Sequence, residues 1–257
     1  MQKLMFLLLN VFLLSFGCKT DKLESIQLSQ DKISMHYNES IQLDIIYSPA
    51  DLDIPPLFNW YSEDTNIATV SSKGLVKGVK IGNTNITVQT ADKLFRANCT
   101  VEIIPVSNLL WLPVVELGQS KAYVKSNESR VLLTEIETAI AYEGENSKIR
   151  MIMYIFEDGK LTSAYVLLQN SLEIVREIRI FLEERFDLLT ISDGARIYKM
   201  NDEVIIVMMV DNAYGLTIFF MENTFSDLDG NLADNQTASV SDINRSLHKK
   251  HGVFQHP

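Results

Sequence analysis

Short runs of alternating apolar and polar residues, separated by turn-forming residues, dominate the segment 25–105. Ile41, Leu43 and Ile45, for example, give three apolar positions at a spacing of two. Successive side chains of a strand point to opposite faces of a sheet, so this period predicts strands that are buried on one face. No window of the segment shows a sustained helical period. It is therefore predicted to fold as a β-sandwich of short strands.

The charge of the chain excludes one large class of partners. The 257 residues include 23 basic and 33 acidic ones, which gives a formal net charge of -10. A protein that binds nucleic acid needs a basic face, and here the only clustered basic residues are Lys249 and Lys250. No nucleic-acid partner is expected. The hydrophobic content of 46% is typical of a globular protein, and the length favours two domains.

Residues 1–17 are typical of a signal peptide. Lys3 supplies a positive charge, and residues 4–16 form an apolar run that only Asn10 and Ser15 interrupt. A membrane-spanning helix needs about 20 apolar residues, whereas the apolar region of a signal peptide needs only about 7 to 15. The run is therefore predicted to direct export and not to span the membrane.

The signal peptide ends at a cysteine. The sequence Leu14-Ser15-Phe16-Gly17-Cys18 places a small residue directly before the cysteine and resembles the lipobox of bacterial lipoproteins. The resemblance implies cleavage before Cys18 and lipidation of its thiol, with residues 18–24 as a lipidated tether to the outer membrane. The alternative is an ordinary signal peptide followed by a buried or incidental cysteine.

Cys99 is the other cysteine of the chain. If Cys18 carries a lipid, Cys99 has no partner within the chain for a disulfide bond. It lies in a strand-like stretch, and free cysteine is one of the most frequently buried residue types. Cys99 is therefore predicted to be a core residue and not a nucleophile.

Five motifs follow one another within the segment 25–105. They are Tyr47-Ser48-Pro49, Trp60-Tyr61-Ser62, Asn66-Ile67-Ala68-Thr69-Val70, Gly74-Leu75-Val76-Lys77-Gly78 and Gly82-Asn83-Thr84-Asn85-Ile86-Thr87-Val88. Their order and spacing resemble the bacterial immunoglobulin-like domain, group 2. The resemblance implies a stalk, spacer or recognition module of an exported protein, adhesins included, without an active site of its own. Tyr61 or Phe58 could stack on a glycan, or could simply pack within a hairpin.

A second domain is predicted over residues 108–222. The prolines at 105 and 113 mark the change of pattern. Ser120 is a suitable N-cap for a short helix that runs to about residue 127. Strands are predicted at 131–133 and 138–142, and a hairpin is predicted between 148–157 and 160–168, because Asp158-Gly159 between alternating apolar runs is a strong turn signal.

A longer helix is predicted over residues 171–188, with its start at Asn170. Apolar residues recur there at spacings of three and four and predict one buried stripe, which is made of Leu172, Val175, Ile178, Leu182 and Phe186. The charged residues between them, Glu183, Glu184 and Arg185 included, are predicted to form a solvated face. Three strands follow, at 195–200, 204–210 and 216–221. The order predicts an α+β two-layer domain with an antiparallel sheet and one long helix, in a chain that is mainly β.

The start of this domain carries a second, weaker resemblance. The pattern Gly118-x-Ser120, Val124 and Phe156-x-Asp158-Gly159-Lys160-Leu161 is similar to the helix-hairpin unit of β-lactamase-inhibitor-like proteins and of an outer-membrane assembly lipoprotein. It implies a scaffold or assembly role. Residues 223–257 are rich in Asp, Asn, Ser and Gly without periodicity and are predicted to be a flexible tail.

The sequence contains no recognisable catalytic motif. Its histidines are His36, His248, His251 and His256, and none belongs to a His-Glu-x-x-His motif; Gly-x-Ser-x-Gly and phosphate-loop motifs are also absent. His248 and His251 could share a metal only if the tail were helical.

Neighbouring carboxylates do not supply a catalytic pair either. Glu157 and Asp158 lie at a hairpin tip, and Glu183 and Glu184 diverge by about 100° on a helix. The stretch 227–231 resembles a calcium loop but lacks its glycine and glutamate at the required positions. No catalytic residue, metal ligand or cofactor is predicted, and the ligand-binding residues stay unknown.

The sequence therefore favours a non-enzymatic lipoprotein of the outer membrane, exposed at the cell surface. An immunoglobulin-like stalk would present residues 108–222 to an unknown glycan or protein, in adhesion or recognition. The alternative is a scaffold or assembly factor that faces the periplasm.

Overall fold

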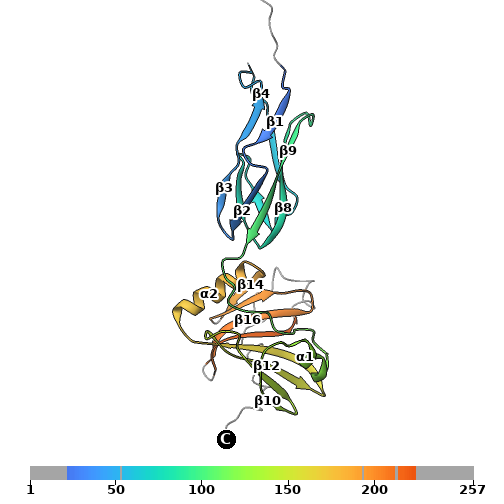
Figure 1. The fold of residues 1–257 in the computed structure, drawn as a ribbon, viewed down its shortest axis with the longest axis vertical. Coiled ribbons are helices and arrows are strands. Elements are labelled where there is room, and N and C mark those ends of the chain that lie inside the picture. The colour runs from blue at the N-terminus through green and yellow to red at the C-terminus, as the bar shows by residue number, and fades with distance from the viewer. Residues whose placement is uncertain (1–21, 53, 193, 212–213, 224–257) are drawn as a thin grey trace, which may run out of the picture.

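A computed structural model describes residues 22–52, 54–192, 194–211 and 214–223. The predicted signal peptide, Cys18, most of the predicted tether and the predicted tail beyond Asn223 lie outside the described residues. Two β-rich parts follow one another along the long axis of the molecule, with β1 and β4 at one end and β10 at the other (Figure 1).

The first part consists of short strands in three sheets. They are β1 (Ser25–Leu28), β2 (Lys32–His36), β3 (Ser40–Gln42), β4 (Ile45–Ser48), β5 (Phe58–Ser62), β6 (Ala68–Val70), β7 (Leu75–Gly78), β8 (Gly82–Thr90) and β9 (Arg96–Ile104). The sheets have the strand orders β2-β9-β8-β5, β3-β7-β6 and β1-β4. Strand β2 runs parallel to β9, and the other neighbours are antiparallel.

Alternate residues of these strands, together with Leu43 between β3 and β4, form one apolar core. It contains Ile33, Met35, Leu43, Ala68, Val76, Ile86, Cys99, Val101 and Ile103, with Trp60 packed against it. Cys99 is a free cysteine and fully buried, which confirms its prediction as a core residue. The period of two at Ile41, Leu43 and Ile45 predicted one continuous strand, and this prediction is wrong, because Ile41 belongs to β3 and Ile45 to β4. The chain crosses between sheets at Leu43 and Asp44, whose backbone N–H groups donate to the Gly74 carbonyl and the Ser29 hydroxyl.

The second part contains a single antiparallel sheet of eight described strands. Its elements are α1 (Lys121–Asn127), β10 (Leu132–Ile136), β11 (Ala139–Glu143), β12 (Ile149–Glu157), β13 (Lys160–Leu168), α2 (Leu172–Glu183), β14 (Asp187–Ser192), β15 (Ala195–Lys199), β16 (Val204–Asp211) and β17 (Gly215–Glu222). The strand order is β10-β11-β12-β13-β17-β16-β15-β14. The chain is thus mainly β with several sheets, as predicted.

These elements form two consecutive units, each a helix followed by four strands, which meet at β13 and β17. The edge strands β10 and β14 both contain Leu-Leu-Thr, at 132–134 and 188–190, and each has a register shift at that point. Glu128 and Glu184 are the C-cap residues of α1 and α2. This internal repetition was not predicted from the sequence.

The second helix is shorter than predicted. It is capped by Ser171 and not by Asn170, and it ends at Glu183. Leu172 is exposed, whereas Ile174, Ile178, Phe181 and Leu182 are buried against the sheet. The residues that follow leave the helix because they pair with β15 as strand β14. Four strands therefore follow the helix, not three.

Both faces of this sheet carry apolar residues. Val124 of α1 and the buried residues of α2 pack on one face with Ile152, Tyr154 and Phe220, among others. Met153, Ile155, Ile205 and Val207 belong to a second buried cluster on the opposite face. Asn223 is not part of a tail, because it is buried and donates from its backbone N–H to the Glu203 carbonyl.

Candidate functional site

Residues 105–120 join the two parts, between β9 and α1, and are called here the linking segment. A buried carboxylate holds the start of this segment. The backbone N–H of Val106 donates to Oε2 of Glu184 at 2.7 Å, and that of Ser107 donates to Oε1 at 3.2 Å. Arg185 forms an ion pair with the same carboxylate and donates from Nη2 to the Ser107 carbonyl at 3.0 Å. The Glu184 side chain is 0% exposed. The prediction of a solvated face is wrong for Glu184, because Val106 and Ser107 of the linking segment cover the end of α2.

The tip of the first part also contacts this helix end. The backbone N–H of Ile81 donates to the Glu184 carbonyl at 2.9 Å, and Lys80 Nζ lies 2.6 Å from Oδ1 of Asp187. The Arg185 guanidinium lies over the Phe181 ring at 3.8 Å from its centroid. Asp187 is largely exposed, so its ion pair contributes little to stability. The main-chain bonds to Glu184 are the stronger restraint on the junction.

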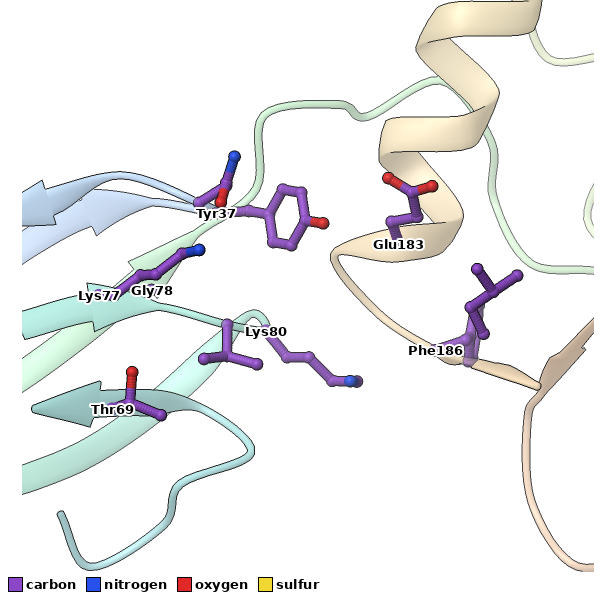
Figure 2. A pocket seen from close by; sticks show the side chains of 10 residues that line it. Tyr37, Thr69, Lys77, Gly78, Lys80, Glu183 and Phe186 are labelled. Atoms are coloured by element: carbon purple, nitrogen blue, oxygen red, sulfur yellow. The ribbon is translucent and has the colours of Figure 1, made fainter. Parts of the chain in front are cut away.

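A cleft of about 580 Å³ lies between the two parts. Tyr37, Lys77 and Lys80 line it from the first part, and Glu183 and Phe186 line it from the second. The Tyr37 ring extends toward Glu183 across the cleft (Figure 2). Burial and the Glu183 charge raise the pKa of Tyr37. Side chains of both parts thus share one polar and aromatic cavity.

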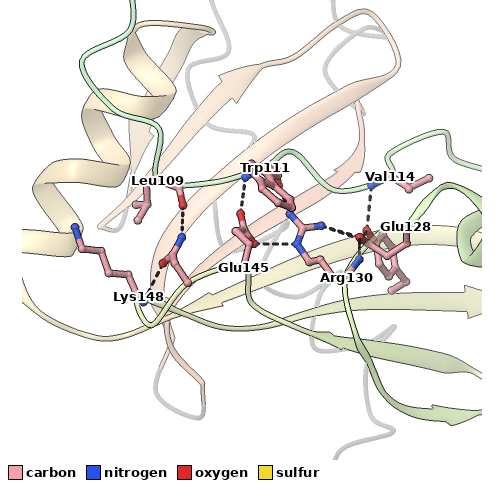
Figure 3. Close-up of polar contacts among 9 residues, drawn as sticks. Leu109, Trp111, Val114, Glu128, Arg130, Glu145 and Lys148 are labelled. Carbon is pink, nitrogen blue, oxygen red and sulfur yellow. Dashed lines mark hydrogen bonds and ion pairs between the residues drawn. The ribbon is translucent and has the colours of Figure 1, made fainter.

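A second buried charge cluster holds the linking segment farther along (Figure 3). Arg130 forms ion pairs with Glu128 at 2.9 Å and with Glu145 at 2.8 Å, and none of the three side chains is more than 5% exposed. The Trp111 backbone N–H donates to Glu145 at 2.5 Å, and its carbonyl accepts from Arg130. Burial lowers the pKa of Arg130, but the hydrogen bond to Glu145 and the nearby negative charges outweigh it and raise that pKa.

Tyr154 connects this cluster to the same segment. Its hydroxyl donates to Glu128 and accepts from the Val114 N–H at 3.1 Å. Burial, together with the hydrogen bond to Glu128, raises the pKa of Tyr154 above its ordinary value. Asn146 Nδ2 also donates to the Leu109 carbonyl at 2.8 Å. The linking segment is therefore fastened to the sheet at several points and does not act as a loose tether.

An exposed apolar surface lies beside this cluster. Trp111 is 61% exposed although its main chain is fixed on both sides, and the Arg130 guanidinium lies 5.9 Å from its ring centroid. We call distal surface the exposed residues Trp111, Leu112, Val131, Leu132, Leu133 and Ile136. Four of them belong to β10 or directly precede it, and β10 lies at the end of the molecule opposite β1 (Figure 1). Leu132 pairs with Tyr142 on one face of the sheet and Ile136 pairs with Ala139 on the other, so these residues lie on both sides of the sheet edge. Exposed apolar patches on a protein surface often mark contact sites.

The residues singled out in the sequence are not brought together. Cys18 and the stretch 227–231 lie outside the described residues. His36 is half-buried in β2, and Asp158 lies in the β12–β13 turn. The Phe58 ring lies 6.0 Å from that of Tyr47, in keeping with a packing role, whereas Tyr61 is 37% exposed.

The described residues contain no group of three or more His, Cys, Asp or Glu side chains placed to hold a metal ion. Within the same ranges, no helix is long and apolar enough to cross a membrane.

Sequence reasoning missed the two buried charge clusters and the distal surface. Their signals were present: an arginine follows the C-cap glutamate of each helix within two residues, and Trp111 stands between prolines. The functional weight of these residues depends on burial, which the pattern alone does not give.

Comparisons with known proteins gave solved structures of low similarity to the chain and a family model for the first part. Solved structures that resemble the chain include the surface layer protein SbsC, domains 1–6 (15% identity, TM-score 0.29), SbsC domains 5–6 (13%, 0.29) and an intimin mutant of EHEC O157:H7 (14%, 0.24). They cover 79%, 79% and 55% of this chain. The chain in turn spans 22%, 85% and 90% of those chains.

No curated protein matches the chain. A family model matches residues 22–101, which include β1 to β8 and most of β9. These residues form a bacterial Ig-like domain of group 2.

Proposed function

We propose that the chain is a non-enzymatic, lipid-anchored protein of the outer membrane, exposed at the cell surface. Its Ig-like domain would hold an α+β binding domain, residues 108–222, away from the membrane, where that domain contacts a protein or glycan in adhesion or recognition. The lipid on Cys18 would be the anchor. Ig-like domains of this group occur in exported proteins, which supports the location.

The observation that carries this proposal is the position of the distal surface. The first described strand, β1, and the edge strand β10 lie at opposite ends of the molecule (Figure 1). An anchor before β1 would therefore leave β10, with Leu132, Leu133 and Ile136 of the distal surface, farthest from the membrane. Its apolar character and its fixed tryptophan favour a protein ligand over a glycan, because aromatic anchors with apolar neighbours dominate protein contacts.

The buried charges support a binding role in preference to catalysis. Glu184 and Glu145 accept hydrogen bonds from backbone N–H groups, and Glu128 accepts from Tyr154 and Arg130. Each carboxylate is thereby committed to holding the linking segment and is shielded from solvent. A general acid or base needs access to a substrate proton.

Protease treatment of intact cells tests the location. We expect the native chain to be cleaved while a known periplasmic protein, used as the leakage control, survives. The Cys18→Ala variant should be absent from the membrane fraction. Protection of the native chain until the envelope is opened would overturn surface exposure and favour the periplasm-facing scaffold.

A charge placed on the distal surface tests the contact site. Leu133→Asp and Trp111→Ala should reduce binding of cells to host-protein and glycan arrays by about tenfold or more, as expected for central contact residues. Leu94→Asp is the matched control, because Leu94 is exposed on the Ig-like domain. Equal binding by all three variants would exclude the distal surface as the contact site.

A further inference from the structure

The cleft between the two domains has the dimensions of a small-ligand site. Its volume of about 580 Å³ lies within the range of about 300 to 1,000 Å³ that is usual for ligand pockets, which often occur at domain interfaces. Its walls are held by the bond from the Ile81 N–H to the Glu184 carbonyl and by the Lys80–Asp187 ion pair. The cleft is thus formed before any ligand enters.

Some polar groups of the cleft have partners within the protein. Lys80 is paired with Asp187, and Glu183 forms ion pairs with Arg196 at 3.2 Å and with Arg179 at 3.9 Å. Lys80 and Glu183 therefore each have a partner of opposite charge within the protein. Both side chains line the cleft, but their charges do not by themselves indicate a charged ligand.

Three other polar side chains lack such partners. Across the described ranges of the chain, no hydrogen bond or ion pair engages the side chains of Tyr37, Asn38 or Lys77. All three belong to the Ig-like domain and line the cleft. Lys77 is the positive charge in the cleft that has no negative partner among these residues. The cleft therefore offers a phenol, an amide and one uncompensated cation.

We propose that this cleft binds an acidic saccharide unit. The half-buried Tyr37 ring and the Phe186 and Leu188 side chains offer apolar surface for the face of a sugar ring. The Asn38 amide and the Tyr37 hydroxyl can bond sugar hydroxyl groups, and the Lys77 ammonium can pair with a carboxylate. A neutral sugar would leave Lys77 unpaired. The site is separate from the distal surface, so the inference does not depend on the contact proposed there.

Calorimetry with the exported chain that carries Cys18→Ala tests the proposal. The probes are digalacturonic acid, a glucuronic-acid-containing disaccharide and the neutral disaccharide galactobiose. We expect at least one acidic probe to bind about tenfold or more tightly than galactobiose, as a charge-assisted bond allows. Lys77→Gln should remove this difference, and Tyr37→Ala should weaken all binding.

Lys73→Gln is the matched control, because it removes the same charge from an exposed lysine of the same domain outside the cleft. Binding of neither acidic probe, or an equal loss in Lys73→Gln and Lys77→Gln, would overturn the proposal. Thermal unfolding of each variant excludes loss of the fold. Failure here would leave the protease and Leu133→Asp results unchanged, so it is distinguishable from failure of the proposed function.

Discussion

Glu184 illustrates how single residues fix the geometry of this protein. A buried carboxylate loses its hydration, a cost that is offset only when hydrogen bonds and an opposite charge replace the water. Here two backbone N–H groups and Arg185 do so. Both N–H groups belong to the chain that enters from the Ig-like domain. The cost of burying Glu184 is therefore offset only while Val106 and Ser107 keep this position.

Replacement of Glu184 by glutamine should destabilise the protein. The amide keeps one acceptor oxygen but turns an NH₂ group toward a backbone N–H, and Arg185 loses its charge partner. We expect the free energy of unfolding in urea to fall by about 2–4 kcal/mol. Glu183→Gln is the control and should cost less than about 1 kcal/mol, because its partners are partly exposed. Equal losses would contradict the role assigned to Glu184.

Tyr154 should make the protein sensitive to alkaline pH. Its pKa is raised in the folded state, so its contribution to stability is complete below the unfolded tyrosine value of about 10 and is lost as the pH rises above it. Tyr154→Phe should lower stability at pH 7 by about 1–3 kcal/mol, because the Val114 N–H and Glu128 lose a partner.

The same variant should show a shallower fall of the melting temperature between about pH 9 and about pH 11, which is about one unit on either side of that reference value. Melting curves of both proteins across this range measure the difference. An unchanged slope would mean that Tyr154 does not contribute to the alkaline transition.

At the scale of elements, the β12–β13 hairpin shows what local sequence can specify. Asp158 and Gly159 both have positive φ, of 50° and 74°, which is the conformation that a two-residue hairpin turn of this type needs. The turn residues select this geometry, and the alternating runs on either side supply the pairing.

Gly159→Ala should lower the free energy of unfolding by about 1 kcal/mol. A Cβ at Gly159 would meet no atom within 4 Å, so only the backbone conformation opposes the change. Asp158→Asn is the control and should stay within about 0.5 kcal/mol of the native protein, since asparagine tolerates positive φ. Urea unfolding compares the two; a greater loss in Asp158→Asn would contradict this reading of the turn.

The α2 helix shows where local signals were insufficient. Periodic apolar residues continue through Phe186 and predicted a longer helix, but residues 187–192 pair with β15. Strand pairing depends on a partner strand outside the helical segment, and the helical period does not encode that partner. The buried stripe is likewise shifted to Ile174 and Phe181, because the sheet selects which face is covered.

At the scale of the whole molecule, the two domains should keep a fixed relation. The linking segment is bonded to Glu184 at one end and to the Arg130 cluster at the other. Such a junction transmits the orientation of the Ig-like domain to the distal surface. A protein with this geometry would act as a stiff stalk.

Spin labels at Ser71→Cys and Ser147→Cys test this stiffness. Double electron–electron resonance measures the distribution of distances between the two labels. We expect one narrow distance distribution in the native background. The distribution should be at least about twice as broad when Lys80→Ala and Glu184→Ala remove the side-chain contacts of the junction, because domains without a firm interface move freely. Lys32→Ala, which breaks an exposed ion pair within the Ig-like domain, should leave the distribution narrow. A broad native distribution would exclude a stiff junction.

The sequence by itself determined much of the local structure of this protein. The period of two, the Asp-Gly turn, the cap at Ser120 and the burial of Cys99 follow from steric and hydrophobic preferences that act between near neighbours along the chain. The motifs of the first domain were equally readable, because turn and core residues recur at set distances.

Only the tertiary structure decided which residues carry the candidate sites. Glu184 and Arg130 look like ordinary charged residues in the sequence, and Trp111 looks like an ordinary core residue. Their burial or exposure depends on where the linking segment crosses α2 and the sheet. Desolvation is a property of the assembled elements. No local pattern could therefore have distinguished buried charged residues that hold the linking segment from charged residues on a solvated face.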